Sequence, residues 1–214
     1  MTKKTMNDNE ILALLERFMA ANLPPMRFEI LSDHYDDRTR FIGLALDGSL
    51  RVERTINFRY RLLHCSSTHL ASSQRGRGIG RRVMTNSARL SRELGLDTMK
   101  IIATNEGRYA WARVGFQADN EFWFSAKEAL LNTLKIDARF RNSTDLDLAI
   151  RIIDSNDPLT LHYLTGLKNL VPVEAGGQNE MTSFGRALLT SVGSWRGEFD
   201  LTNKSYMQLL AGRR

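Results

Sequence analysis

The sequence contains a single cysteine, Cys65, and no long apolar run. One thiol cannot form a disulfide within the chain, and it excludes metal clusters built on several cysteines. No stretch approaches the roughly 18 apolar residues that a membrane-spanning helix requires, and the opening residues MTKKTMNDNE lack the apolar segment of a signal peptide. We therefore expect a cytoplasmic, globular protein with no membrane partner.

The composition is otherwise ordinary. With 42% hydrophobic and 25% charged residues, the chain is neither a disordered nor a fibrous sequence. A length of 214 residues is enough to bury a core without disulfides or a structural metal. We expect one domain with an appendage.

The positive charge is unevenly distributed. Eight of the arginines lie between Arg51 and Arg82, a segment whose only acid is Glu53. This cluster indicates an anionic ligand, which could be a nucleotide, a cofactor phosphate or a nucleic acid, because charge reports the sign of a partner rather than its identity. A solvated basic face without a ligand is the alternative.

Hydrophobic periodicity divides the chain into a mixed first part and a helical last part. The first part is predicted to hold a helix at 9–22 capped by Asp8, a hairpin through the Asp47-Gly48 turn, one or two strands at 50–62, a helix from near Gly80 to Gly95, a strand at 98–103 and a short helix at 105–114. Beyond Phe124, helix starts are predicted at Ser125, Thr144 and Asp157, and connecting loops at 176–178 and 194–203. We expect a core of residues 1–125 and a mainly helical extension of residues 126–214 packed on it.

A glycine-rich loop lies at the entrance of the central helix. Arg75, Gly78 and Gly80 form the pattern R-x-x-G-x-G. Glycines let an anion approach the backbone, and the helix that follows presents unpaired N–H groups at the positive end of its dipole. The pattern suits a pyrophosphate, although it is neither a P-loop nor a dinucleotide fingerprint. A turn that only caps the helix remains the alternative.

The loop QRGRGIGRRVM, followed by the strand MKIIATN and a short helix ending in Val114-Gly115-Phe116, resembles the GNAT superfamily of N-acetyltransferases. The resemblance spans residues 40–125. It implies an α+β fold, with a mostly antiparallel mixed sheet whose splayed parallel pair admits the cofactor, flanked by helices. It also implies acetyl-CoA or another acyl-CoA as co-substrate, no metal, and direct transfer of the acyl group to an amine.

The resemblance also implies positions for the cofactor. The backbone amides from Arg77 to Gly80 would hold the pyrophosphate, while His69 to Ala71 run beside the pantetheine and Asn105 contacts it. The implied cofactor-binding residues are Leu70, Ala71, Arg75, Gly76, Arg77, Gly78, Ile79, Gly80, Arg81, Asn105 and Trp111. A backbone N–H of the splayed strands would stabilise the tetrahedral oxyanion.

The chain departs from the family pattern at the proton donor. Many members have a tyrosine four residues before the Gly-Phe pair, where its phenol protonates the departing thiolate, but this chain has Trp111. Tyr109 lies about 200° away around a helix, so it replaces the missing phenol only if the helix starts differently. A thiol of ordinary pKa, near roughly 8.5, can also leave unassisted as a thiolate. The proline that often precedes the loop is replaced by Ser72 or Ser73.

A base must take the proton of the acceptor amine. The candidate catalytic residues are Glu53, His69 and Tyr109, with His64 as a further base. Each has a plainer alternative: an ion pair with Arg51 or Arg54 for Glu53, and a structural hydrogen bond for the histidines. Cys65 is interpreted as a small buried hydrophobe rather than an acylated nucleophile.

The acceptor is left open by the sequence. It could be a small molecule, a peptide, a protein or an amine on aminoacyl-tRNA or another nucleic acid, and an RNA-binding module or a non-catalytic coenzyme A binder is the alternative to an enzyme. The aromatic residues Trp111, Phe122, Trp123 and Phe124 are expected to form core or acyl-pocket walls. The helical extension is predicted to shape the acceptor pocket or a homodimer interface.

Overall fold

The computed structural model describes residues 6–33, 37–173 and 180–212. The chain forms two compact units. Unit 1 comprises the residues up to Ile101 together with those from Asp200 onward, and unit 2 comprises Ile102 to Phe199. The predicted division into residues 1–125 and 126–214 stays a prediction, because compact packing units need not coincide with functional domains. Among the described residues, no helix is long and apolar enough to cross a membrane.

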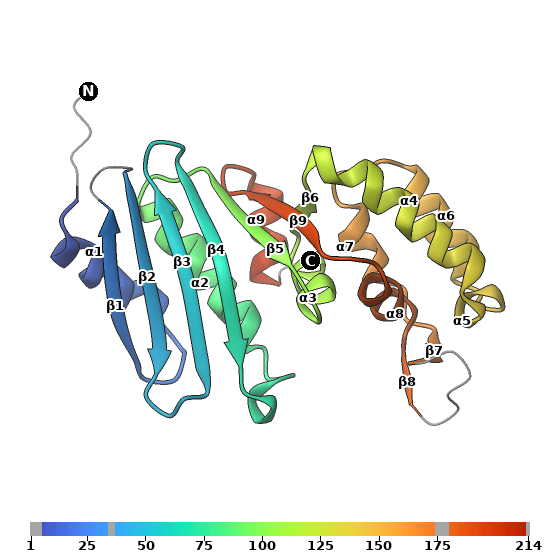
Figure 1. The fold of residues 1–214 in the computed structure, drawn as a ribbon, viewed down its shortest axis with the longest axis horizontal. Helices are drawn as coiled ribbons and strands as arrows, with labels where there is room; N and C mark the ends of the chain where they lie inside the picture. Colours follow the sequence, from blue (N-terminus) through green and yellow to red (C-terminus); the bar gives the residue numbers. More distant parts are fainter. Residues whose placement is uncertain (1–5, 34–36, 174–179, 213–214) are drawn as a thin grey trace. The chain divides into compact units, whose positions relative to one another are not determined.

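Unit 1 is built on a mixed sheet (Figure 1). Four antiparallel strands follow one another in space as in sequence, and a fifth runs parallel to the fourth. Their bounds are β1 Met26–Asp33, β2 Arg38–Ala45, β3 Leu50–Asn57, β4 Leu62–Leu70 and β5 Thr98–Ala103. A crossover through a helix is what a parallel neighbour requires, and the helix between β4 and β5 provides it.

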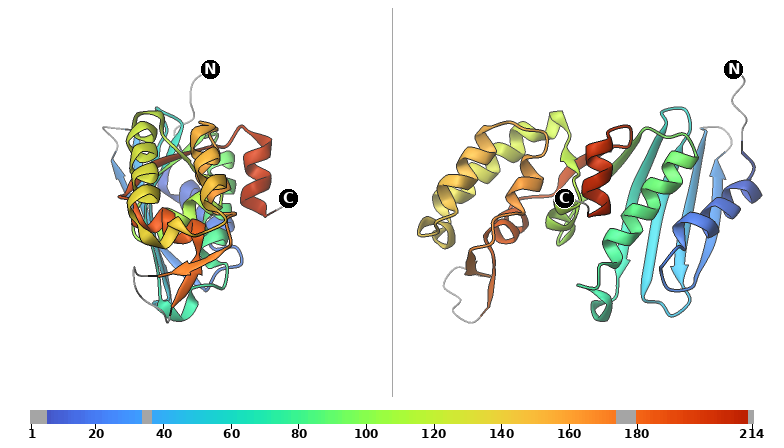
Figure 2. Two further views of the ribbon diagram at one scale, coloured as in Figure 1. Left: turned by 90° about the vertical axis from the view of Figure 1, so that its right-hand side faces the viewer. Right: turned by 180° about the vertical axis from the view of Figure 1, so that it is seen from behind.

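The helices of unit 1 lie on one face of this sheet, as the reverse view in Figure 2 shows. They are α1 Asp8–Leu14, the π-helical segment η1 Leu15–Met19, α2 Ile79–Glu93 and α9 Lys204–Ala211, with the short 3₁₀ turn η2 Ser72–Gln74 before α2. Alternation along β3 turns Val52, Arg54 and Ile56 into the layer beneath α2, and all three are buried. The residues that alternate with them on β3, Arg51, Glu53 and Thr55, lie on the opposite face of the sheet.

The predicted N-terminal helix is confirmed, but its cap is not Asp8. The side chain of Asn7 accepts from the backbone of Glu10, and Glu10 bonds back to Asn7, which completes a capping box. At the other end, the buried amide of Asn86 on α2 donates to the carbonyls of Met19 and Ala21. Carbonyl groups that the helix itself leaves unpaired are thus satisfied by the helix packed beside it.

The predicted hairpin is confirmed at Asp47-Gly48, where Gly48 has a φ of +71°. The alternating segment from Leu50 to Leu62 comprises β3, a turn and the first residue of β4, so the prediction of two successive strands is the correct one of the two alternatives. The chain turns between them at Arg61, which has a φ of +50°. An Arg61–Asp97 ion pair of 2.8 Å ties this turn to the start of β5.

Unit 2 is mainly helical, as expected, but its helices start elsewhere than predicted. Asp119 caps the long helix, so the predicted start at Ser125 is wrong and Ser125 lies within that helix. Thr144 and Asp157 precede helices whose N-caps are Asp145 and Leu159. The helices are α3 Gly107–Arg113, α4 Asn120–Ile136, α5 Ala138–Arg141, α6 Leu146–Asp154, α7 Thr160–Leu164 and α8 Phe184–Ser191.

Unit 2 also contains strands that the sequence did not predict. They are β6 Gln117–Ala118, β7 Leu170–Pro172, β8 Met181–Ser183 and β9 Trp195–Asp200, with β6 paired to β9 and β7 paired to β8, both antiparallel. The predicted loop at 194–203 is therefore wrong over β9, where Trp195, Gly197 and Phe199 are buried in alternation. The loop predicted at 176–178 lies outside the described residues.

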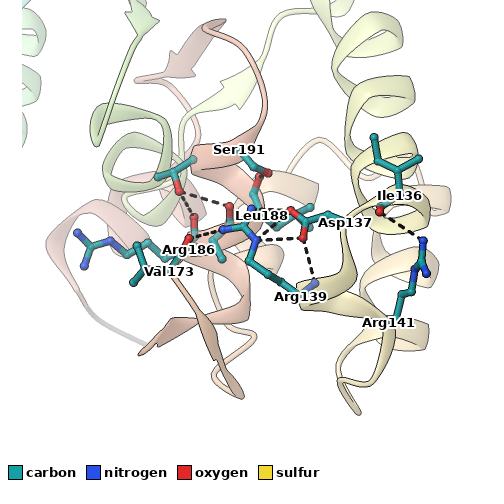
Figure 3. A network of polar contacts seen from close by, with 10 residues as sticks. Ile136, Asp137, Arg139, Arg141, Val173, Arg186, Leu188 and Ser191 are labelled. Atoms are coloured by element: carbon teal, nitrogen blue, oxygen red, sulfur yellow. Dashed lines mark hydrogen bonds and ion pairs between the residues drawn. The ribbon is translucent and has the colours of Figure 1, made fainter. Parts of the chain in front are cut away.

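A polar network joins the corner between α4 and α5 to the end of β7 (Figure 3). The Arg139 guanidinium contacts both carboxylate oxygens of Asp137, at 2.6 Å to the nearer one, and also donates to the Val173 carbonyl. Its hydrogen bonds to Asp137 hold the pKa of that carboxyl below its ordinary value. Phe140 and Phe184 pack edge to face beneath this corner, with ring centroids 4.9 Å apart.

The fold class expected from the sequence is confirmed. The protein has a mixed, mostly antiparallel sheet with one parallel pair, β4 and β5, and flanking helices.

Candidate functional site

The glycine-rich loop forms the entrance of α2, as predicted. Gly76 and Gly78 have φ values of +76° and +75°, and Gly78 is the N-cap of the helix, with no side-chain hydrogen bond to the cap. A left-handed N-cap is open to glycine at little cost, whereas a residue with Cβ is strained there. Ile79 is buried under the first turn and anchors the loop to the core.

The backbone donors of this loop are unpaired within the described part of the chain. The N–H groups of Gln74 and Arg75 bond to Ala71 and Ser72, and the next N–H bonded to a described carbonyl is that of Arg82. Six consecutive N–H groups, those of residues 76–81, thus have no acceptor among the described residues. Such an array at the positive end of a helix has the donors and the dipole that an anion requires.

Space around the glycines is open. A Cβ added to Gly76, Gly78 or Gly80 would meet no described atom within 4 Å. Gly80 is the informative position, because its backbone is helical and its φ lies outside the positive range, so neither strain nor packing calls for glycine. Glycine in a helix costs about 1 kcal/mol relative to alanine, and close approach of a ligand would explain it.

Arginine side chains surround the loop. Arg75, Arg77 and Arg82 are exposed, and no carboxylate of the described residues forms an ion pair with them. Arg82 donates to the Arg77 carbonyl at 3.2 Å and so remains at the loop. The Arg81 guanidinium instead extends toward Gly212, where an added Cβ would lie 2.6 Å from it. Arg81 can therefore offer its backbone N–H to an anion more readily than its side chain.

The parallel ladder between β4 and β5 ends before β4 does. Their ladder pairs Leu62 through Cys65 with Thr98 through Ile101, while β4 continues to Leu70. At the same place β4 has one extra residue: Arg54 faces Cys65 and Glu53 faces Ser67, so Ser66 forms a β-bulge. A bulge changes the direction of a strand, and here it lies next to the last residue pair of the parallel ladder.

Residues 66–70 of β4, which lie beyond the parallel ladder, present backbone groups on the edge of the strand that faces away from β3. Ala71 donates to the Ser49 carbonyl, and alternation along an antiparallel ladder then turns the N–H groups of Leu70 and Thr68 away from β3. Arg75 reaches back to the Leu70 carbonyl, at 3.5 Å from its Nε. The predicted contact of Leu70 and Ala71 with a pantetheine chain stays a prediction.

Arg54 lies beside the bulge and is wholly buried. Its guanidinium donates only to neutral acceptors, and no carboxylate among the described residues pairs with it. The acceptors are the carbonyls of Glu53 and Ser67, the hydroxyls of Thr68 and Ser87, and the sulfur of Met84. No signal in the sequence distinguishes this arginine from the other seven of its cluster.

His64 and Cys65 lie where the parallel ladder ends. Burial lowers the pKa of His64 below its ordinary value, and the charges of Arg54 and Lys100 lower it further. Its Nδ1 is 3.3 Å from the Ser66 hydroxyl. Burial raises the pKa of the Cys65 thiol, which Arg54 opposes in part. A neutral imidazole is therefore favoured here, and a thiolate is disfavoured, as expected for a buried structural cysteine.

The other two base candidates of unit 1 differ from His64. Glu53 forms an ion pair with Arg40 at 2.5 Å and a longer one with Arg51 at 3.9 Å. His69 is exposed and faces Arg51 across the β3–β4 ladder. Of the three residues, His64 alone is both partly buried and located at the end of the parallel ladder between β4 and β5.

The remaining predicted site residues belong to unit 2. Asn105 is exposed, with a φ of +47°, and its carbonyl accepts from Arg108 at the start of α3. Trp111 folds its indole back over Gly107, where an added Cβ would lie 2.9 Å from the indole nitrogen. Tyr109 is half-buried on the same helix. The roles assigned to Asn105, Tyr109 and Trp111 stay predictions.

The aromatic residues at the start of α4 do not form a common wall. Phe124 is 78% exposed, Phe122 is half-buried, and the indole of Trp123 donates to Asn156 at 3.3 Å. Among the described residues, no group of three or more His, Cys, Asp or Glu side chains is arranged to hold a metal ion.

Comparison with known proteins gives similarities of fold only. No family model matches the chain, and no curated protein matches it. Among solved structures, the chain is similar to nourseothricin acetyltransferase, with 21% identity, 44% of this chain and 71% of that chain covered, and a TM-score of 0.34. It is also similar to mutant forms of the spermidine/spermine N-acetyltransferase SpeG from Vibrio cholerae, with 20% identity, 41% and 56% covered, and a TM-score of 0.33.

A third similar structure is Tetrahymena GCN5, with 14% identity, 54% of this chain and 78% of that chain covered, and a TM-score of 0.35. The chain thus spans little more than half the length of the SpeG structure that it matches. Scores of this size do not establish a family, so a functional conclusion has to come from the geometry of the loop and of the strands β4 and β5.

Proposed function

We propose that the protein is an acyl-CoA-dependent N-acyltransferase of the GNAT type. The observation that carries this proposal is the row of six N–H groups at residues 76–81 that have no acceptor among the described residues and that lie at the start of α2, between the parallel strands β4 and β5 in the chain. A pyrophosphate bound there would be held by backbone donors and by Arg75, Arg77 and Arg82. Charge-assisted bonds of this kind are about twice as strong as neutral ones.

The edge of β4 beyond its ladder with β5, at residues 66–70, would hold the pantetheine and the thioester. In the proposed reaction, the lone pair of a primary amine attacks the thioester carbon, a C–N bond forms, and the C–S bond breaks. The oxyanion formed between these steps is stabilised by a backbone N–H on this edge of β4, and the sulfur leaves as the thiolate of coenzyme A. As the C–S bond breaks, the nitrogen loses its extra proton and the thiolate takes up one proton from the surrounding water, so that the amide and the coenzyme A thiol are released.

His64 is the proposed base. A primary ammonium must lose a proton before it can attack, and a neutral imidazole can accept that proton directly or through a water molecule. Its lowered pKa keeps His64 in the neutral form at physiological pH. Glu53, which Arg40 and Arg51 engage, is less suited to this step.

Thermal denaturation in the presence of coenzyme A tests the binding half of this proposal. We expect coenzyme A to raise the melting temperature with concentration, since a ligand that binds the folded state stabilises it by mass action, about 2.7 kcal/mol at 100 times Kd. In Gly80→Leu, the helix should persist because its backbone is compatible with leucine and the space is open. The rise in melting temperature should disappear.

Gly193→Leu is the matched control, because an added Cβ also meets nothing within 4 Å at Gly193, in unit 2. It should respond to coenzyme A as the parent does. If Gly80→Leu keeps the full response, the pyrophosphate is not bound at this loop. Release of thiol from acetyl-CoA with a panel of polyamines, peptides and amino sugars then tests transfer itself.

A second candidate acceptor is an amine carried by a nucleic acid. The face of the unit 1 sheet opposite its helices carries five cationic residues, Arg27, Arg38, Arg40, Arg51 and Lys100. The acidic residues Glu29 and Glu53 lie on the same face, and Asp33 is paired in register with Arg38. A cavity of about 300 Å³ on this face is lined in part by Arg38 and Arg40. Acceptor binding that falls steeply with added salt would favour this candidate over a neutral amine.

A further inference from the structure

Arg54 presents a charge that the fold does not neutralise. It is 0% exposed, and all five of its N–H donors reach neutral acceptors within the described residues. Burying a cation without an anionic partner costs several kcal/mol before its hydrogen bonds are counted, and apolar residues of similar volume are often as stabilising. Stability alone therefore does not account for an arginine here.

The hydrogen bonds of Arg54 are concentrated on the bulge. One terminal nitrogen donates to the Glu53 carbonyl at 2.9 Å and to the Ser67 carbonyl at 2.6 Å, and the other donates to the Thr68 hydroxyl at 3.0 Å. Glu53 and Ser67 are the first ladder pair beyond the extra residue Ser66. The guanidinium thus bridges β3 and β4 at the point where their ladder is interrupted.

The bond to Ser67 also acts on the peptide unit that follows it. The carbonyl of Ser67 and the N–H of Thr68 belong to the same peptide group, and no cis peptide occurs in the described residues. In a trans peptide these two dipoles point in opposite directions, so the N–H of Thr68 points away from Arg54 and toward the edge of β4 that lies beyond its ladder with β5. A short bond from a cation to the carbonyl makes that N–H a stronger donor.

We propose that Arg54 is a positioning residue for acyl transfer: it fixes the β4 bulge and polarises the Ser67–Thr68 peptide, whose N–H stabilises the thioester oxyanion. This inference rests on the proposed function. The positive potential of Arg54 at the site acts in the same direction, since negative charge develops on the thioester oxygen as the amine attacks. The same potential reaches the neighbouring His64 and Cys65, whose ionisation it influences.

Two substitutions separate the charge from the shape. Arg54→Met keeps much of the volume and removes both the charge and the donors, whereas Arg54→Lys keeps the charge and one donor group that can reach the Ser67 carbonyl. Arg89→Met, on the exposed side of α2, is the control for loss of one positive charge. For each folded variant, the stabilisation by coenzyme A, kcat, and KM for acetyl-CoA are measured, together with the pH profile of kcat/KM.

We expect Arg54→Met to bind coenzyme A within about threefold of the parent and to lose roughly 10- to 100-fold in kcat, since removing an oxyanion donor outright costs about 100- to 1,000-fold. Arg54→Lys should recover most of the loss, and Arg89→Met should behave as the parent. The acid limb of the pH profile should move to higher pH in Arg54→Met only, because the pKa of His64 rises when the neighbouring charge is removed.

Equal losses of kcat in Arg54→Met and Arg54→Lys, with the acid limb of the kcat/KM profile at its parental pH, would mean that Arg54 has only a structural role. A folded Arg54→Met with parental kcat would remove the inference and leave the proposed function standing. A parent chain that neither binds coenzyme A nor transfers an acyl group would remove both. If Arg54→Met does not fold, Arg54→Lys decides: a folded lysine variant with a kcat reduced more than 10-fold contradicts the polarisation.

Discussion

The imidazole of His64 lies 3.3 Å from the hydroxyl of Ser66, across the residue at which the parallel ladder of β4 and β5 ends. The chain thereby brings a half-buried titratable group to the end of the parallel ladder, beside the bulge. The sequence indicated His64 as one base among several, and its partial burial at the end of this ladder distinguishes it from Glu53 and His69.

Replacing His64 with glutamine should lower kcat/KM for the amine about 100-fold, because general base catalysis contributes about 100- to 10,000-fold. Binding of coenzyme A should be unchanged. In the parent, the acid limb of kcat/KM should lie below the ordinary histidine pKa of about 6.5, since burial and the nearby charges favour the neutral imidazole. His162→Gln, in unit 2, is the control. Parental rates in His64→Gln would exclude the residue as the base.

Replacing Glu53 with glutamine should change kcat by less than about threefold. The carboxylate is engaged by Arg40 at 2.5 Å, and exposed or half-exposed ion pairs contribute about 0–1 kcal/mol. The melting temperature should fall by no more than a few degrees. A loss of 100-fold or more in steady-state kinetics, with coenzyme A binding intact, would restore Glu53 as a catalytic candidate.

Replacing Gly185 with alanine should destabilise the protein by about 1–3 kcal/mol or more, because an added Cβ would lie 1.9 Å from the carbonyl oxygen of Leu164 and backbone has to move. The matched change Gly193→Ala should stay within about 0.5 kcal/mol, since the added methyl meets nothing within 4 Å. Urea denaturation of the two variants measures the difference. Equal midpoints would mean that α8 does not pack against Leu164 as described.

Asp137 should make stability depend on pH in the acid range. Its hydrogen bonds with Arg139 lower the pKa of the folded carboxyl, so its stabilising contribution is fully present above the unfolded pKa of about 3.9 and is lost as the pH falls through the lower folded pKa. In Asp137→Asn the N-cap oxygen is retained and the charge is removed. Melting temperatures of parent and variant should differ at pH 7 and converge in strong acid; a constant gap would contradict the assignment.

Some local features of this protein could be predicted from its sequence. Gly48 and Gly78 adopt a positive φ, which glycine tolerates at little cost, so the turn and the helix entrance follow from the residues themselves. At the entrance of α2, the glycines also precede a helical apolar pattern. The predicted caps failed where two adjacent polar residues compete, as with Asn7 and Asp8, because the choice depends on how the chain enters the helix.

The pairing of segments that are distant in the sequence could not be predicted in this way. The sequence predicts a loop at β9 because the strand is only six residues long. Its buried residues Trp195, Gly197 and Phe199 alternate with charged ones, and such a short strand is stabilised by its partner strand rather than by its own sequence. The burial of Arg54 is of the same kind. Its register opposite Cys65 and its cover by α2 distinguish it from the arginines around it.

The glycine-rich loop at the entrance of α2 and the Asp47-Gly48 hairpin could be predicted from the sequence, because they depend on the backbone freedom of a few neighbouring residues, and the family resemblance indicated the class of the fold. The buried arginine, the bulge of β4 and the histidine at the end of the parallel ladder could be identified only in the folded chain. Those features arise where β3, β4, β5 and α2 meet, and the free energy of a buried charge or a bulge is set by atoms that are distant in the chain.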